Sequence, residues 1–423
     1  MNPGDQTRER LLGLHRRILE SDPSWMAPLR RSGAEIFAAE GLPHTKLEEW
    51  RYTNLAGLAK LDLESSENAA PAEIASVAPT ASGGSPVVFV NGVYVAGQKT
   101  DERSVSSLAS VESVPAEFGT LVDAKAHPLA ALNSALLRDG AVVRIPRDTQ
   151  LAAPIHLLFV STGGVRCPRL LVVAEPGSRA QVIQEHVSIG DDGGFTDALT
   201  EVLVSANARV DLVNVQRESD TAFHVSNTAA RVERAGRLES HVLTFGGRLV
   251  RNDLTVSLAG EGGEAILNGL FLGNGKRLID NHSLVDHAVA HCNSRQLYKG
   301  VLGDDSRGVF RGRVVVRPDA QLTHAVQSNP NLLLSNDAEI DTKPQLEIHA
   351  DDVKCSHGSS IGQLDEDALF YLCSRGIGAQ HARDLLTRGF VQAILDAIPL
   401  ETLREGLGED VQRALRQLGS ADS

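Results

Sequence analysis

The middle of the sequence contains a repeat of short apolar segments, which limits the folds open to this chain more than any other feature. Apolar residues stand 28 positions apart at Val182, Val210, Leu238 and Ile266, and each follows a turn-like segment containing glycine, serine or asparagine. Short strands at regular spacing without intervening helices are typical of a solenoid, in which each coil buries one face against the next. The pattern therefore favours a parallel β-helix, with a β-sandwich or a jelly roll as the alternatives.

The composition fits a stack of aliphatic strands. Hydrophobic residues make up 42% of the 423 residues but aromatic residues only 4%, so the core has to consist mainly of valine, leucine, isoleucine and alanine. A chain of this length is too long for one ordinary core, and we expect two or three folding units or one elongated unit. The longest apolar runs fall well short of the roughly 20 residues that a membrane-spanning helix requires.

Charge and cysteine usage limit the partners and the compartment. The chain has 41 basic and 54 acidic residues, and the resulting net charge of −13 disfavours nucleic acid and anionic membranes as general partners. Its cysteines, at positions 167, 292, 355 and 373, are widely spaced and form no CxxC pair. The start of the chain also lacks the apolar stretch of a secretory signal, so we expect a cytoplasmic protein without a disulfide framework.

Changes in composition divide the chain into four parts. Helical periodicity at residues 5–20 and 26–40 precedes a stretch rich in Ala, Ser, Pro and Gly, and three further helical patterns follow the last strand. The predicted organisation is an N-terminal helical region over 1–63, a linker over 64–86, a β-helix core over 87–362 with a short helix near 128–138, and a C-terminal helical domain over 363–423.

Three other motifs favour structural interpretations. The polar and aromatic stretch from Gly41 to Leu55 is best explained by packing. Histidines at 282, 287 and 291 have loosely metal-like spacing, but they match no zinc signature, and histidines on strand turns are more often hydrogen-bonded or solvated.

Lys276 is followed by arginine rather than serine or threonine, so no phosphate-binding loop is present. Any ATP hydrolysis therefore has to come from a partner.

The candidate chemistry lies at Cys355 and His357, where the strand-rich region ends. On an extended backbone, residues two apart point to the same face, so this thiol and this imidazole could reach one metal ion or a small cluster. Two ligands do not fill a tetrahedral metal site, so this pair is either half of a metal site or no metal site at all. An isolated cysteine is most often a small buried hydrophobe, and His357, beside a Gly-Ser-Ser turn, is the better functional candidate.

These residues also resemble a known family. Segments Lys354–Asp365, Leu369–Leu372 and Ser374–Ile377 resemble the C-terminal signature of the SufB/SufD family, subunits of the Suf machinery for iron–sulfur cluster assembly. Glu48–Thr53, Phe89–Gly92 and His127–Asn133 are similar to N-terminal landmarks of the same family, so the resemblance covers essentially the whole chain. At Ser356–Ile361 the sequence departs from the pattern of SufB-type chains, which favours the SufD side of the family.

The resemblance implies a right-handed parallel β-helix with helical regions at both ends, acting as a non-enzymatic scaffold in a complex with a SufB-like subunit and the SufC ABC-type ATPase. It implies that His357, with Cys355 less certain, supplies part of a coordination sphere for iron or a nascent cluster at the SufB interface. That group would be transient in the complex, with no cofactor bound tightly to the isolated chain, which could also form a homodimer. The C-terminal helices would bind SufC, and the candidate contact residues are Leu369, Phe370, Arg375, Leu385, Leu386 and Phe390.

Other functions remain open from the sequence. The chain could be a SufB-like cluster scaffold, or an interaction protein that holds its partners without touching iron. A β-helix enzyme acting on carbohydrates is a candidate from a different class, which would need carboxylates along a groove. The low aromatic content and the missing secretory signal argue against that enzyme.

Overall fold

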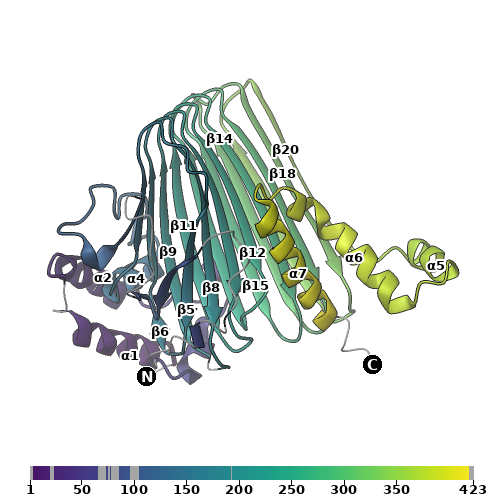
Figure 1. The fold of residues 1–423 in the computed structure, drawn as a ribbon, viewed down its shortest axis with the longest axis horizontal. Coiled ribbons are helices and arrows are strands. Elements are labelled where there is room, and N and C mark those ends of the chain that lie inside the picture. Colours follow the sequence, from purple (N-terminus) through teal and green to yellow (C-terminus); the bar gives the residue numbers. More distant parts are fainter. Residues whose placement is uncertain are drawn as a thin grey trace.

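The computed structural model describes residues 3–19, 23–64, 73–74, 77, 85–95, 104–191 and 193–418. Most of the linker predicted over residues 64–86 lies outside these ranges. The described residues form a parallel β-helix with helices beside its first and last coils (Figure 1), which confirms the predicted fold class. Where the chain divides into independently folding parts stays a prediction.

Two sheets face each other across the interior of the β-helix, and the chain passes from one to the other in each coil. In spatial order, sheet A consists of β2 (Val93–Tyr94), β1 (Val87–Val90), β5 (Ile155–Ser161), β8 (Arg179–Ser188), β10 (Arg209–Arg217), β12 (Arg237–Thr244), β14 (Glu264–Gly273), β16 (Asn293–Leu302), β18 (Thr323–Leu333) and β20 (Val353–Gly362). Sheet B consists of β19 (Glu339–Ile348), β17 (Arg307–Val316), β15 (Leu278–His287), β13 (Leu249–Leu258), β11 (Phe223–Val232), β9 (Phe195–Val204), β7 (Arg169–Ala174), β4 (Ala141–Ile145) and β3 (Val105–Ser107), with β6 (Val165–Arg166) also paired to β9.

The length of a coil is not constant, which corrects the predicted repeat. Val210 pairs with Leu238, 28 residues later, as the pattern suggested. Leu238, however, pairs with Ala265, and Val182 pairs with Leu212 rather than with Val210. The turns between strands differ in length, so the strands stay in register while the sequence spacing drifts. The stacking of coils was predicted correctly, but the uniform period was wrong.

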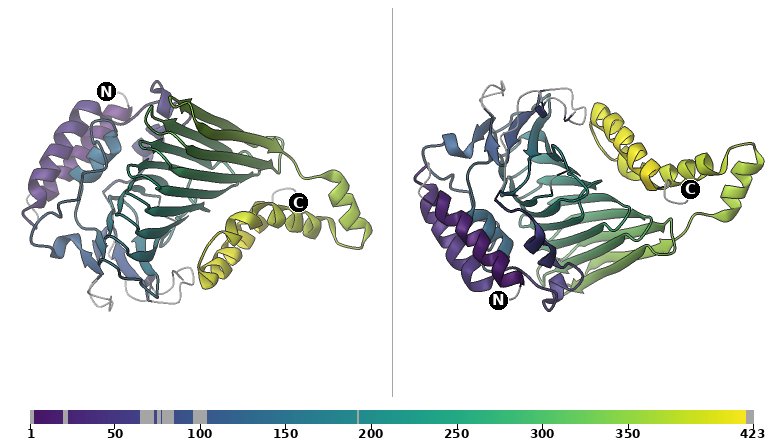
Figure 2. Two further views of the ribbon diagram at one scale, coloured as in Figure 1. Left: turned by 90° about the horizontal axis from the view of Figure 1, so that it is seen from above. Right: turned by 90° about the horizontal axis from the view of Figure 1, so that it is seen from below.

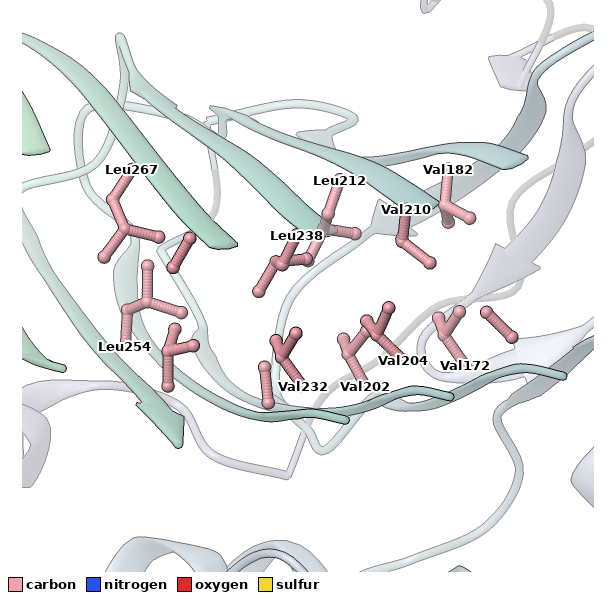
Figure 3. Close-up of a cluster of buried hydrophobic side chains, with 14 of the residues drawn as sticks. Val172, Val182, Val202, Val204, Val210, Leu212, Val232, Leu238, Leu254 and Leu267 are labelled. Carbon is pink, nitrogen blue, oxygen red and sulfur yellow. The ribbon is translucent and has the colours of Figure 1, made fainter. Parts of the chain in front are cut away.

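An aliphatic core fills the space between the sheets. Inward-facing residues such as Val182, Val210 and Leu238 are fully buried, and Figure 3 shows them pointing across the interior toward Val202 and Val232 of sheet B. Burying one valine or leucine side chain stabilises the fold by about 1.5–3 kcal/mol. The stack therefore needs few aromatic residues, as the composition indicated.

Helices α1 (Pro3–Ile18), α2 (Met26–Glu40) and α4 (Pro128–Ala135) lie beside the first coils, as does the 3₁₀ segment η3 (Leu108–Ser110). The 3₁₀ segments η1 (Glu48–Trp50) and η2 (Leu55–Lys60) contact later coils, through Arg251 of β13 and Phe223 of β11. Helices α2 and α4 touch at Gly33, where a Cβ atom would lie 2.6 Å from the carbonyl oxygen of Ala131. Only glycine permits this approach, because any side chain would clash with the backbone of α4.

Three helices follow the last strand, α5 (Glu366–Ser374), α6 (Ala379–Asp396) and α7 (Glu401–Leu418). Asp365 caps α5 by accepting hydrogen bonds from the backbone N–H groups of Asp367 and Ala368. The second half of α6 and all of α7 pack against the outer face of sheet A, where Val215 and Leu270 contact a row that includes Ile394 and Leu407. Among the helices described, none combines the length and the apolar character that crossing a membrane requires.

Candidate functional site

The last coil of the β-helix is open. Strand β20 pairs only with β18 and strand β19 only with β17 among the strands that the structure describes, so each is the edge of its sheet. No residue of β20 is buried, and Ile348 and Ile361 expose large parts of their side chains here. Edge strands with unpaired backbone groups are normally covered, because they can pair with another chain. This end of the molecule is therefore suited to contact a second polypeptide.

Cys355 and His357 lie on the inner face of β20, at this open end. In the β18–β20 register, Cys355 is the neighbour of Ala325, and His357 is the neighbour of Gln327. Ala325 is fully buried in the core between the sheets, so both candidate residues face the interior. Cys355 is half-buried against that core, whereas His357 is exposed. The strand geometry thus brings both candidates to one face, as their spacing predicted.

The two side chains differ as metal donors. Burial raises the pKa of the Cys355 thiol, and the backbone at Ala325 only partly opposes this effect. A thiol binds metal as the thiolate, so a raised pKa makes Cys355 the weaker candidate. An exposed imidazole has no comparable desolvation penalty, and His357 has no hydrogen-bond partner within the described part of the chain. His357 is the better placed donor.

These two residues do not form a complete metal site. No group of three or more His, Cys, Asp or Glu side chains placed to hold one metal ion occurs within the residues that the structure describes. The remaining ligands of anything that Cys355 and His357 bind would therefore have to come from outside the described residues.

The histidines at 282, 287 and 291 point in different directions. His282 lies on the outer face of sheet B, with Nε2 2.9 Å from the carboxylate of Asp280. His287 faces the interior, and its Nε2 lies 2.8 Å from the hydroxyl of Ser294. His291 occupies a turn in the left-handed region at φ 63°. The metal-like spacing is a coincidence of strand and turn positions, because the three imidazoles do not converge.

The candidate contact residues for an ATPase differ in how accessible they are. Helix α5 stands away from the β-helix (Figures 1 and 2), and Phe370 on it, Arg375 directly after it and Leu385 on α6 are exposed. Leu369 and Leu386 are half-buried. Phe390 packs on its own chain: Lys299 lies 4.7 Å from its ring centroid and donates a 2.6 Å hydrogen bond to its carbonyl oxygen. The exposed apolar surface is therefore centred on α5 and the start of α6.

Comparison with known proteins agrees with this architecture. A family model described as the SufBD core domain of the SUF system for iron–sulfur cluster assembly matches residues 158–390, and one described as the SufBD N-terminal region matches residues 11–157. The chain belongs to the SufBD family. It is an iron–sulfur cluster assembly protein of that family.

Full-length relatives support this assignment. An iron–sulfur cluster assembly SufBD family protein of Synechocystis sp. is 32% identical, over 92% of this chain and 91% of its own length. The iron–sulfur cluster assembly protein SufD of Escherichia coli is 30% identical, over 92% of this chain and 93% of its own. SufD of Bacillus subtilis is 25% identical, over 93% of this chain and 95% of its own.

In this SufBD family member, the segment Glu48–Thr53 packs on the outer face of sheet B beside a pocket of about 290 Å³. The guanidinium of Arg251 lies 3.9 Å from the centroid of the Trp50 ring and donates hydrogen bonds to the backbone of Glu49 (2.7 Å) and to Asp280 (2.9 Å). A hydrogen bond with His282 lowers the pKa of Glu49 to about 2. These charges satisfy one another, so the cluster attaches the N-terminal segment to the sheet, and packing explains the stretch.

A second buried cluster of this SufBD family member attaches α7 to sheet A. We call it the anchor cluster, and its members are His156, Glu185, Arg217 and Asp410. Glu185 is fully buried and lies 2.9 Å from both His156 Nε2 and Arg217 Nε, while Arg217 Nε lies 3.7 Å from the carboxylate of Asp410 on α7. Sequence reasoning missed this cluster because its members are far apart in the chain, and the only signal was charge in strands that are otherwise apolar.

The anchor cluster predicts a loss of stability in acid. Burial raises the pKa of Glu185, but the hydrogen bond from His156 and the charge of Arg217 outweigh it and lower the pKa to about 2. An unfolded glutamate titrates near 4.3, so the unfolded state binds more protons between these values. The stabilisation is complete above about pH 5 and is lost as the pH falls toward 2, by about 3 kcal/mol.

Urea unfolding at pH 7 and pH 3 tests this dependence. The difference in unfolding free energy between the two pH values should be smaller in Glu185→Gln, which cannot ionise. The pKa of Asp280 is also lowered to about 2, so Asp280 contributes to the pH dependence of stability in the same direction. Its contribution is the same in the wild type and in the variant and therefore cancels when the two are compared. An equal pH dependence in wild type and variant would contradict the assignment.

Proposed function

We propose that this chain is a non-catalytic scaffold subunit, and that His357 contributes a ligand to iron or to a nascent cluster at an interface with a SufB-like subunit. The observation that most directly supports the proposal is an exposed imidazole on the inner face of the last strand, at an end where both sheets have free edges. Family membership supports the general role in cluster assembly.

A site shared between two chains suits an assembly reaction. Imidazole and thiolate donors are compatible with iron and iron–sulfur species. Since the described part of the chain offers at most two donors here, cysteine from the SufB-like subunit would complete the coordination sphere. Such a site opens when the two subunits separate, which provides a route for releasing the cluster. The iron is cargo in this scheme rather than a resident cofactor.

The direct test compares cluster formation by the assembled complex with histidine and with alanine at position 357. Unchanged cluster formation would favour the alternative of an interaction protein that holds its partners without touching iron. In isolation, the same free edges are available to a second copy of the chain, so light scattering on the purified protein would show whether a homodimer forms.

The proposal places the protein in the cytoplasm. Its four cysteines are unpaired, as expected in a reducing compartment.

The same proposal assigns α5 to an ABC-type ATPase of the SufC kind. The sequence has no phosphate-binding loop of its own, so a partner has to bind the nucleotide. On α5, the side chains of Phe370 and Tyr371 are 75% and 57% exposed. Exposed aromatic residues of this kind are common hot spots in protein interfaces.

Replacing Phe370 and Tyr371 together with serine is expected to weaken ATPase binding at least about 30-fold, since the loss of even one aromatic hot spot costs about 2 kcal/mol or more. Titration calorimetry with the purified ATPase would measure the affinity. The melting temperature should not change, because both side chains are mostly exposed. Val114→Ser is a matched control, because this exposed valine lies far from α5 in the chain. Wild-type affinity in the double variant would place the ATPase surface elsewhere.

A further inference from the structure

A line of hydrogen-bonded side chains crosses the interior of the last coils and ends next to His357. Gln327 Nε2 donates to Gln296 Oε1 at 2.6 Å, and Gln296 Nε2 donates in turn to the hydroxyl of Ser283. Gln296 and Gln327 are neighbours in the β16–β18 register, and Gln327 and His357 are neighbours in the β18–β20 register. The two glutamines and His357 therefore occupy one inward-facing row on three successive coils.

The donors in this line all point away from the open end. The amide nitrogen of Gln327 donates to the coil before it, so its oxygen is the group left for a contact with the last coil. Gln327 is 2% exposed, and its Oε1 has no hydrogen-bond partner among the described residues. A buried acceptor without a partner costs about 1–3 kcal/mol, so a donor is expected close to it.

Of the two residues of the last coil that lie in register with Gln327 and with the residue it reaches on sheet B, only one has a side chain that can donate. A Cβ atom on Gly312 would lie 1.8 Å from Gln327 Nε2, so Gln327 extends across the interior to Gly312 on sheet B. The residues of the last coil in register with these two are His357 on β20 and Pro344 on β19. Proline has no N–H and no polar side chain. The imidazole of His357 is the available donor.

We infer that Gln327 is a positioning residue for His357. The two side chains are not hydrogen-bonded to each other in this structure, but a ring nitrogen of His357 can donate to the unpartnered Oε1. That hydrogen bond would fix the tautomer and leave the lone pair of the other nitrogen facing out of the open end. Histidines that bind metal commonly donate their second ring nitrogen to such an acceptor, which fixes both the tautomer and the ring orientation. The inference rests on the proposed ligand role of His357. It adds that the row of glutamine amides, Gln296 and Gln327, sets the tautomer and orientation of the imidazole before the partner subunit binds.

The tautomer of His357 tests the inference in the full-length chain. Long-range proton–nitrogen correlation spectra of protein labelled with ¹⁵N-histidine would be recorded at pH 8, where an imidazole is ordinarily neutral, with His357 assigned from the His357→Asn spectrum. We expect a single tautomer in the wild type, a mixture of both in Gln327→Met, and a single tautomer again in Gln327→Glu, which restores the acceptor. A mixture in the wild type, or no change in Gln327→Met, would overturn the inference.

The matched control is Gln184→Met, the same change at a 3% exposed glutamine of β8, which is far from His357. It should leave the signals of His357 unchanged. If Gln327→Met does not fold, the wild-type spectrum and that of Gln327→Glu still decide the question.

Metal binding gives a second readout. Gln327→Met is expected to weaken the binding of ferrous iron, titrated anaerobically into the complex with the SufB-like subunit, by about 10- to 100-fold. The outcomes separate the two proposals. A single tautomer together with full activity of His357→Ala would refute the ligand role and leave the positioning contact intact. Loss of activity in His357→Ala together with a mixed tautomer would refute only the positioning role.

Discussion

Replacing His357 with alanine is expected to lower cluster formation by the assembled complex at least about 100-fold, because loss of a ligand should exceed the effect of changing a residue behind it. The subunits should still assemble, since contacts along the edge strands do not depend on one exposed imidazole. The stability of the isolated chain should fall by no more than about 1–3 kcal/mol, the cost of leaving Gln327 Oε1 without a donor, since the imidazole itself is exposed. Anaerobic reconstitution followed by visible absorption would measure cluster formation, and gel filtration would measure assembly.

Two further variants make this experiment specific. His324→Ala removes another exposed histidine, one coil earlier, which lies in register with Lys354 on the outer face of β18, and it should have no effect. Cys355→Ala should reduce cluster formation less than His357→Ala, because the half-buried thiol, with its raised pKa, is the weaker donor. Full activity of His357→Ala would show that the chain holds its partners without binding iron.

Replacing Arg217 with alanine is expected to lower the free energy of unfolding by about 3–5 kcal/mol. The change leaves the carboxylate of Glu185 fully buried without its arginine, and it removes the cation nearest Asp410 on the sheet side of α7. A buried charge that loses its partner keeps its desolvation penalty. Urea denaturation would measure the loss of stability, and hydrogen exchange over residues 401–418 would show whether α7 separates from sheet A.

The same carboxylate offers a matched control. Arg413 lies 3.2 Å from Asp410 on the solvent side and is mostly exposed, so Arg413→Ala should cost less than about 1 kcal/mol. Combining Arg217→Met with Glu185→Gln removes the buried charge together with its partner and should recover part of the lost stability. If Arg217→Ala cost no more than Arg413→Ala, the anchor cluster would not hold α7.

The anchor also limits how the C-terminal helices can be studied. Their apolar faces cover Val215, Leu270 and neighbouring residues of sheet A, so deleting residues 363–423 would expose this surface to water. The β-helix would then be destabilised, and lost ATPase binding would not identify the contact residues. Substitutions on α5 avoid this problem, since none of its described residues is buried.

Much of the fold could be predicted from neighbouring residues. Alternation of apolar and polar positions identifies strands, and Asp365 identifies the start of α5. Cys355 and His357 are two positions apart on one strand, which places their side chains on the same face. The regular spacing of strands indicated stacked coils. The uniform spacing of 28 residues failed, because turns of different length keep the strands in register: Ser294 pairs with Ala325, 31 residues later.

The sequence by itself determined the local features of this protein: the strands and turns, the helix caps, the aliphatic core and the shared face of Cys355 and His357. Each depends on residues only a few positions apart. Only the tertiary structure decided which side chains meet across coils, such as Gln327 behind His357 and Arg217 beneath Asp410. The physical reason is that the length of every turn sets the register between coils, and an error of one residue turns a side chain from the interior to the outer face.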